Sequence, residues 1–72
     1  MKLSHREHTV LTLIACGLTD KETAEKLKIS PRTVEKHMAS VILKLNAKNR
    51  VNAAILYMRL NPNWKLKIRY VV

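Results

Sequence analysis

Basic side chains are concentrated in the second half of this 72-residue chain, and their density there indicates an anionic partner. Residues 30–72 contain nine Lys or Arg and a single acidic residue, Glu35, whereas residues 1–29 contain five Lys or Arg and four acidic residues. The whole chain has a formal net charge of +9 at pH 7. Nucleic acid and an acidic membrane surface are the two kinds of partner that fit this charge.

Residues that could carry catalysis or bind a metal are few and poorly spaced. His5 and His8 are three residues apart, but Cys16 is more than two helical turns from His5, so the three could share a metal only if a helix were distorted. The chain has no phosphate-binding loop and no order of Ser, His and Asp that suggests a triad. We therefore predict no enzyme activity, no metal site and no cofactor, and we expect the lone Cys16 to be a small core residue.

Membrane insertion and secretion are not indicated either. The longest apolar runs are a few residues long, far short of the ~20 residues that cross a bilayer. The residues after Met1 are charged where a secretory signal would be apolar. We expect a cytoplasmic chain, associated with the nucleoid if its anion is DNA.

Two capping boxes predict the first two helices. Ser4 and Glu7 fit the pattern in which a hydroxyl accepts from the amide three residues on and the carboxylate accepts from the hydroxyl residue's own amide. They predict a first helix over about residues 5–16. Thr19 and Glu22 repeat the pattern and predict a second, shorter helix.

The next two helices also have recognisable starts. Ser30 followed by Pro31 predicts a third helix over about residues 31–45. Asn49 is a cap for a fourth helix that ends near Leu60. The buried stripe expected for the third helix consists of Val34, Met38, Val41, Ile42 and Leu45. The apolar residues that indicate the fourth helix are Val51, Ala54, Ile55 and Met58.

The predicted fold is therefore all-α, a four-helix bundle over residues 1–62 followed by a basic tail over residues 63–72. In the tail, apolar and basic residues alternate, which is the period of a strand. We expect it to be either a flexible arm or a strand that pairs with another chain.

The second and third helices form a helix-turn-helix pattern, whose second helix can lie in a DNA major groove. Such pairs also occur as purely structural helix corners, so a role in DNA binding needs support from the charge distribution. The outward arc of the third helix gives that support, because it carries only one acidic residue. This arc comprises Arg32, Thr33, Glu35, Lys36, Ala39, Ser40 and Leu43, with Lys44 at its edge.

Several motifs together resemble the LuxR/NarL/GerE-type DNA-binding domain over roughly residues 3–58. They are Leu3-Ser4-His5-Arg6-Glu7 with Val10-Leu11, Gly17-Leu18-Thr19 with Lys21-Glu22 and Ala24, Ile29-Ser30, Thr33-Val34 with His37, Lys44-Leu45 and Arg50. The resemblance implies a bacterial transcription regulator that binds DNA as a dimer, with the third helix in the major groove and the fourth at the dimer interface. It further implies either a small stand-alone regulator of the GerE type or a domain excised from a longer protein.

The resemblance also assigns candidate DNA contacts. Residues expected at base edges are Glu35, Lys36, Ala39 and Ser40. By their chemistry, Glu35 could accept from cytosine, Lys36 could donate to guanine and Ala39 could touch a thymine methyl group. An ion pair of Glu35 with Arg32 or with the neighbours of Lys36 is the alternative for that carboxylate. Residues expected at phosphates are Arg32, Thr33, His37, Lys44, Lys48 and Arg50. For His37 a structural role, such as a bond to Glu7, is the alternative.

The expected partners are double-stranded DNA, a second copy of the chain and, further, RNA polymerase or another regulator. Residues expected at the dimer interface are Asn52, Ile55, Leu56 and Arg59; the alternative is that Trp64 and the tail cover this face. A two-fold dimer would read an inverted repeat with half-sites about 10 base pairs apart. The alternative function is a protein-interaction or anionic-surface-binding module that acts through the basic tail.

Overall fold

Side-chain caps start the four α-helices in the part of the chain that the structure describes, as predicted. The Ser4 hydroxyl accepts from the Glu7 amide (3.1 Å) and the Glu7 carboxylate accepts from the Ser4 amide (2.8 Å). Thr19 and Glu22 form the same pair of bonds, at 3.1 and 2.8 Å. Two further caps, Ser30 and Asn49, accept from the amides of Thr33 and Asn52.

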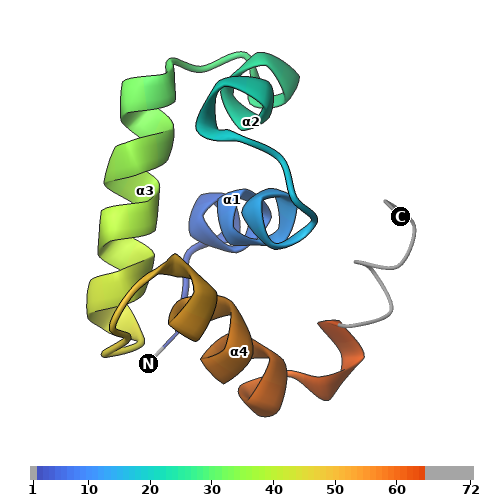
Figure 1. Ribbon diagram of the computed structural model, residues 1–72, viewed down its shortest axis with the longest axis vertical. Coiled ribbons are helices and arrows are strands. Elements are labelled where there is room, and N and C mark those ends of the chain that lie inside the picture. The colour runs from blue at the N-terminus through green and yellow to red at the C-terminus, as the bar shows by residue number, and fades with distance from the viewer. Residues whose placement is uncertain (1, 65–72) are drawn as a thin grey trace.

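The computed structural model describes residues 2–64, and in that range it contains helices and no strand (Figure 1). The helices are α1 (His5–Ala15), α2 (Asp20–Leu27), α3 (Pro31–Lys44), α4 (Arg50–Leu60) and the short 3-10 helix η1 (Pro62–Trp64). This confirms the all-α, four-helix fold with a helix-turn-helix. The strand-like alternation expected in the tail involves residues 65–72, which lie outside the described residues.

Three residues with positive φ angles end the first three α-helices. Gly17, after α1, has a φ of 99°, which a glycine adopts at little cost. Lys28, after α2, and Asn46, after α3, have φ angles of 59° and 54°. Lys28 carries a Cβ in this left-handed region, so the sharp turn between α2 and α3 is made against a steric cost.

The core lies where α1 and α2 pack against one side of α3, which runs along one edge of the molecule (Figure 1). Its buried residues are Leu3, Val10, Leu11, Ala24, Val34, Met38, Val41, Ala53 and Trp64. From the predicted stripe of α3, Val34, Met38 and Val41 are fully buried, whereas Ile42 and Leu45 are partly buried. Thr23 of α2 is also fully buried, and its hydroxyl has no hydrogen-bond partner among residues 2–64.

The apolar residues that indicate α4 in the sequence are not the ones that it buries most deeply. Ala53 is its one fully buried residue in the described range, while Val51 is 70% exposed and Ile55 is 42% exposed. Ala54 and Met58 are partly buried against the core. The helix therefore packs through its small residues and leaves larger apolar side chains at the surface.

Trp64 belongs to the core, although it lies beyond the domain boundary expected at residue 62. Its side chain is 3% exposed, its Nε1–H donates to the Thr12 hydroxyl of α1 (2.7 Å), and its ring meets Tyr57 of α4 edge-on at 5.0 Å between centroids. The packed part of the chain therefore extends past Pro62, and Trp64 does cover part of α4.

Candidate nucleic-acid interface

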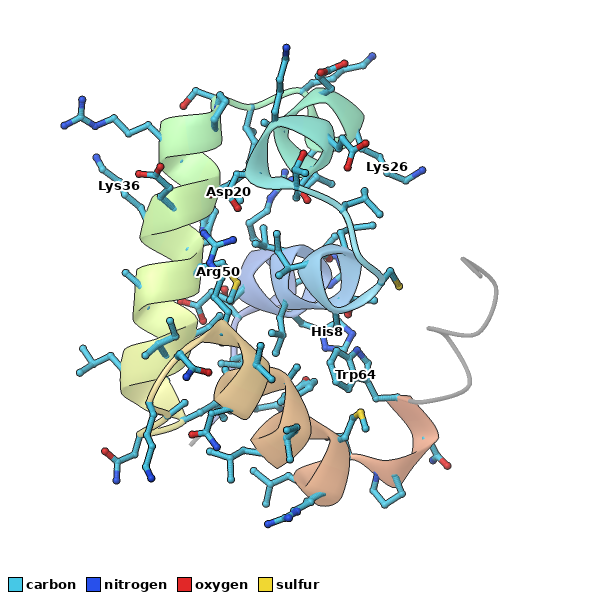
Figure 2. The ribbon with its side chains drawn as sticks, in the orientation of Figure 1. His8, Asp20, Lys26, Lys36, Arg50 and Trp64 are labelled. Carbon is cyan, nitrogen blue, oxygen red and sulfur yellow. The ribbon has the colours of Figure 1, made fainter. Side chains whose placement is uncertain are left out.

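The outer face of α3 is a row of exposed side chains. Arg32, Glu35, Lys36 and Ala39 are exposed, and Thr33, His37 and Ser40 are partly buried. In Figure 2 the Lys36 side chain points away from the other helices. The sequence therefore identifies correctly which side of this helix faces solvent.

The turn before α3 fixes the direction in which that face points. Ile29 packs against the core, and its amide donates to the Ala24 carbonyl at the end of α2 (3.0 Å). Val34, four residues after the Ser30 cap, is fully buried. An apolar residue on each side of a cap sets the entry angle of the chain, so α2 and α3 are held as one rigid corner.

Glu7 of α1 connects the start of the chain to the C-terminal half of α3. The Glu7 residue is 7% exposed. Its Oε1 accepts from Lys44 Nζ (2.7 Å) and from the Ser4 amide (2.8 Å), and its Oε2 accepts from the Ser40 hydroxyl (2.6 Å). The bonds from Lys44, then Ser40 and Ser4, lower the pKa of Glu7 to about 2 and outweigh the opposing effect of burial. Two residues expected to contact DNA, Ser40 and Lys44, thus have a partner inside the chain.

His37 is not among the donors to Glu7 within residues 2–64. Its imidazole is partly buried, between the buried stripe and the outer face of α3. Thr33 lies at the start of the helix, where its hydroxyl is 2.9 Å from the Ser30 hydroxyl. Both residues keep part of their surface in solvent.

A second ion pair connects the first residues of α2 and α4. The Arg50 guanidinium donates from both terminal nitrogens to the two carboxylate oxygens of Asp20, with Nη2 2.8 Å from Oδ2. Arg50 lowers the pKa of Asp20, and Asp20 raises the pKa of Arg50. The charge of Glu35 makes a smaller contribution that also raises the pKa of Arg50. Figure 2 shows Asp20 and Arg50 beside α3. The ion pair between them therefore holds α2 and α4 together next to that helix.

Three basic side chains in or after α3 have no partner among residues 2–64. The ion pairs between residues 2 and 64 are Lys44 with Glu7 and Arg50 with Asp20. Arg32, Lys36 and Lys48 are exposed, and within the same range their side chains make neither an ion pair nor a hydrogen bond. The Glu35 carboxylate, for its part, forms no ion pair with Arg32 or Lys36. These three positive charges remain available for an anion.

The residues expected at a dimer interface lie along α4. Ile55 and Arg59 are exposed and Leu56 is partly buried. Asn52 is partly buried and its side-chain oxygen accepts from the Lys48 amide (2.9 Å), which ties the loop before α4 to the helix. A shallow apolar hollow of about 240 Å³ lies between the end of α1 and α4, lined by Ile14, Ala15, Arg50, Val51, Ala54, Ile55 and Met58.

Other kinds of site find little support in the described part of the chain. No three His, Cys, Asp or Glu side chains among residues 2–64 lie close enough to hold a metal ion. Burial raises the pKa of the Cys16 thiol, which favours its neutral form. No helix in this range combines the length and the apolar character that crossing a membrane requires.

Known proteins resemble this chain over most of its length. The family model described as bacterial regulatory proteins, luxR family, matches residues 1–57. The transcriptional regulatory protein FixJ of Rhizobium meliloti is 51% identical over 47 residues, which cover 65% of this chain and 23% of FixJ. The nitrate/nitrite response regulator protein NarP of Escherichia coli is 42% identical over 57 residues, which cover 79% of this chain and 26% of NarP. The uncharacterized transcriptional regulatory protein YhcZ of Bacillus subtilis is 38% identical over 65 residues, 90% of this chain and 30% of YhcZ. The chain thus spans less than a third of the length of these relatives, which by name are regulators and not enzymes.

Proposed function

The chain belongs to the luxR family of bacterial regulatory proteins, and from this membership we propose that it binds double-stranded DNA sequence-specifically and regulates transcription. In this proposal α3 lies in the major groove. The observation that carries it is the outer face of α3, where Arg32 and Lys36 are exposed and unpaired while the opposite face is buried in the core. A rigid helix with one buried face and one basic face is suited to insertion into an anionic groove.

The proposed base contacts come from the middle of α3. Lys36 donates to guanine, Glu35 accepts from the amino group of cytosine, and Ala39 touches a thymine methyl group. The Ser40 hydroxyl donates its proton to Glu7, so it meets a base as an acceptor. Lys36 is accessible to DNA, because it is exposed, points outward and has no ion-pair partner in the described chain.

The proposed phosphate contacts divide into two groups. Arg32 and Lys48 carry charges that have no ion-pair partner among residues 2–64, and Thr33 and His37 add further hydrogen-bonding side chains. Lys44 and Arg50 are already paired with Glu7 and Asp20. We therefore expect Lys44 and Arg50 to release fewer counterions on binding than the unpaired cations do. The residues proposed to contact phosphates are Arg32, Thr33, His37, Lys44, Lys48 and Arg50.

We also propose that the domain binds as a dimer through α4, with Asn52, Ile55, Leu56 and Arg59 at the interface. The exposure of Ile55 in an apolar hollow supports this, because apolar surface next to a groove is typical of a contact between proteins. A two-fold dimer reads an inverted repeat with half-sites about 10 base pairs apart. RNA polymerase or another regulator is a further proposed partner, and the nucleoid in the cytoplasm is the proposed location.

The test is the selection of bound duplexes from a randomised DNA pool at about 0.15 M salt, where purely electrostatic binding is weakened. We expect enrichment of an inverted repeat. Binding without an enriched sequence would contradict base readout, and no binding would contradict the proposed function itself. Sedimentation of the protein free and on the enriched duplex measures the dimer; a monomer in both states at micromolar concentration would refute the α4 interface.

Two lysines separate base readout from phosphate binding. Lys36→Ala should lower affinity and relax the preference for the base that Lys36 reads, whereas Lys48→Ala should weaken all sequences alike and reduce the salt slope by about one. Equal and uniform losses from both variants would contradict this division.

Truncation tests the alternative of an anion-binding module that acts through the basic tail. Because Trp64 is buried, the truncation should end after Trp64 and remove residues 65–72 only. Retained duplex binding supports α3 as the DNA-binding element. Loss of all anion binding would favour the tail.

A further inference from the structure

Leu43 of α3 is the most exposed large apolar side chain among residues 2–64. It is 81% exposed, compared with 70% for Val51, 67% for Leu60 and 42% for Ile55. It contributes little to the core, and it lies on the helix that is proposed to enter DNA. No role for it follows from the contacts assigned so far.

Leu43 continues the row of Lys36 and Ala39. Seven residues make almost two helical turns, so Leu43 returns to the face of Lys36, and Ala39 lies between them at the spacing of neighbouring turns. A shallow hollow of about 450 Å³ adjoins the two apolar residues, lined by Ala39, Ile42, Leu43, Asn46 and Ala47. We call Ala39 and Leu43 the apolar strip.

The surroundings of the apolar strip indicate what it contacts. Exposed, unpaired Lys36 precedes it on the same face and exposed Lys48 follows it in the chain. A fitting partner therefore offers a small apolar group flanked by negative charge. The major groove of DNA has such a group, the C5-methyl of thymine between two rows of phosphates. An acidic membrane combines the same properties, but it requires a broad apolar face, and here Glu35 is exposed near the strip.

We infer that Leu43, together with Ala39, is a specificity-determining residue that contacts a thymine methyl group in the major groove. The inference rests on the proposed function. Leu43 lies about 10 Å along the helix axis from Lys36, at 1.5 Å per residue. Because base pairs are stacked 3.4 Å apart, the thymine lies about three base pairs from the base that Lys36 reads.

The experiment first removes the thymine methyl groups from the DNA and then changes the protein. In the duplex enriched by the full chain, each thymine is replaced in turn by deoxyuridine, which keeps the base pair and removes only the C5-methyl. We expect one such replacement, about three base pairs from the Lys36 position, to weaken binding about fourfold, the effect of losing one buried methyl. Leu43→Ala should weaken binding to the thymine duplex by at least as much and should make the effect of that replacement clearly smaller than fourfold, because only Ala39 then remains at the methyl group. Leu60→Ala, which shortens another highly exposed leucine, on α4, is the matched control and should leave the fourfold effect in place.

The possible outcomes separate this inference from the function on which it rests. If every deoxyuridine replacement affects the parent chain and Leu43→Ala equally, or if the enriched site has no thymine in that region, the role of Leu43 is refuted while DNA reading stands. If Leu43→Ala weakens random duplexes as much as the enriched one, or abolishes binding to vesicles of anionic lipid, the strip has another partner and the inference also fails. If the parent chain enriches no sequence, the proposed function fails first.

Discussion

Replacing Glu7 by glutamine should destabilise the fold, because Glu7 caps α1 and also ties α1 to α3. A pKa displaced from 4.5 to about 2 corresponds to roughly 3 kcal/mol in favour of the charged carboxylate. The Lys44 side chain is 32% exposed, so solvent screens part of this attraction, and we expect Glu7→Gln to lower the free energy of unfolding by about 2 kcal/mol at pH 7.

The stabilisation by Glu7 should depend on pH in a definite direction. Because the pKa of Glu7 is lower in the folded than in the unfolded state, the stabilisation is complete above pH 4.5 and is lost as the pH falls toward 2. The difference between the parent chain and Glu7→Gln should therefore shrink over that range. Urea unfolding followed by circular dichroism at pH 7, 4 and 2 measures it.

Glu22→Gln is the matched control for the capping part of the effect. Glu22 has the same place in the capping box of α2, at the same 2.8 Å from its cap amide, but it is exposed. Glu22→Gln should lower the free energy of unfolding by distinctly less than Glu7→Gln does. Equal losses in the two variants, or a Glu7→Gln deficit that stays constant down to pH 2, would refute the claim that the charge of Glu7 joins α1 to α3.

Further changes test the burial, backbone and ion-pair features of the same domain. Thr23→Val should raise the free energy of unfolding by about 1 kcal/mol in urea, because it removes a buried hydroxyl that has no partner; a lower midpoint would show that the hydroxyl is bonded. Lys28→Gly should raise the melting temperature and add about 0.5 to 1 kcal/mol to the free energy of unfolding, because glycine adopts the positive φ without strain. Lys26→Gly, inside α2, is the control and should lower the melting temperature. A lower melting temperature in both variants would argue against strain at Lys28. Arg50→Lys keeps the charge but loses the two-pronged bond to Asp20, and should cost about 0.5 to 1 kcal/mol at pH 7. Because the pKa of Asp20 is lowered in the folded state, the stabilisation by the pair is complete above the ordinary value of 3.8 and is lost as the pH falls through the lowered value. The cost of Arg50→Lys should therefore shrink as the pH falls below 3.8, and an unchanged cost in acid would contradict this.

The helix starts could be predicted from the sequence because each depends on contacts within four residues. The caps Ser4, Thr19, Ser30 and Asn49 stand where the structure has them. The face of α4 could not be predicted in the same way. Val51 is one of the apolar residues that indicate this helix, yet it is 70% exposed, and Ala53, which is not among them, is the buried residue. A helix that lies close to its neighbours is selected for small side chains at the contact, and hydrophobicity alone does not reveal that.

The candidate site shows the same limit. The arc of α3 could be predicted from helical periodicity, because Lys36 and Ala39 are exposed while Val34 and Met38 are buried. The partners of Lys44 and Arg50 could not, because Glu7 is 37 residues away and Asp20 is 30 residues away along the chain. Sequence shows that a lysine is basic, whereas only the fold shows whether a carboxylate already holds it.

The burial of Trp64 also has a practical consequence, because it is the single tryptophan of the chain. Figure 2 shows Trp64 on the side of α1 away from α3. This tryptophan is therefore an intrinsic fluorophore at the contact of α1, α4 and η1, away from the basic face. Its indole is buried, is hydrogen-bonded to Thr12 and meets Tyr57 edge-on, so the release of η1 from α1 and α4 would change its surroundings. Tryptophan fluorescence is therefore suited to following the docking of η1, in the same sample in which labelled DNA reports on α3 and without a dye on the protein.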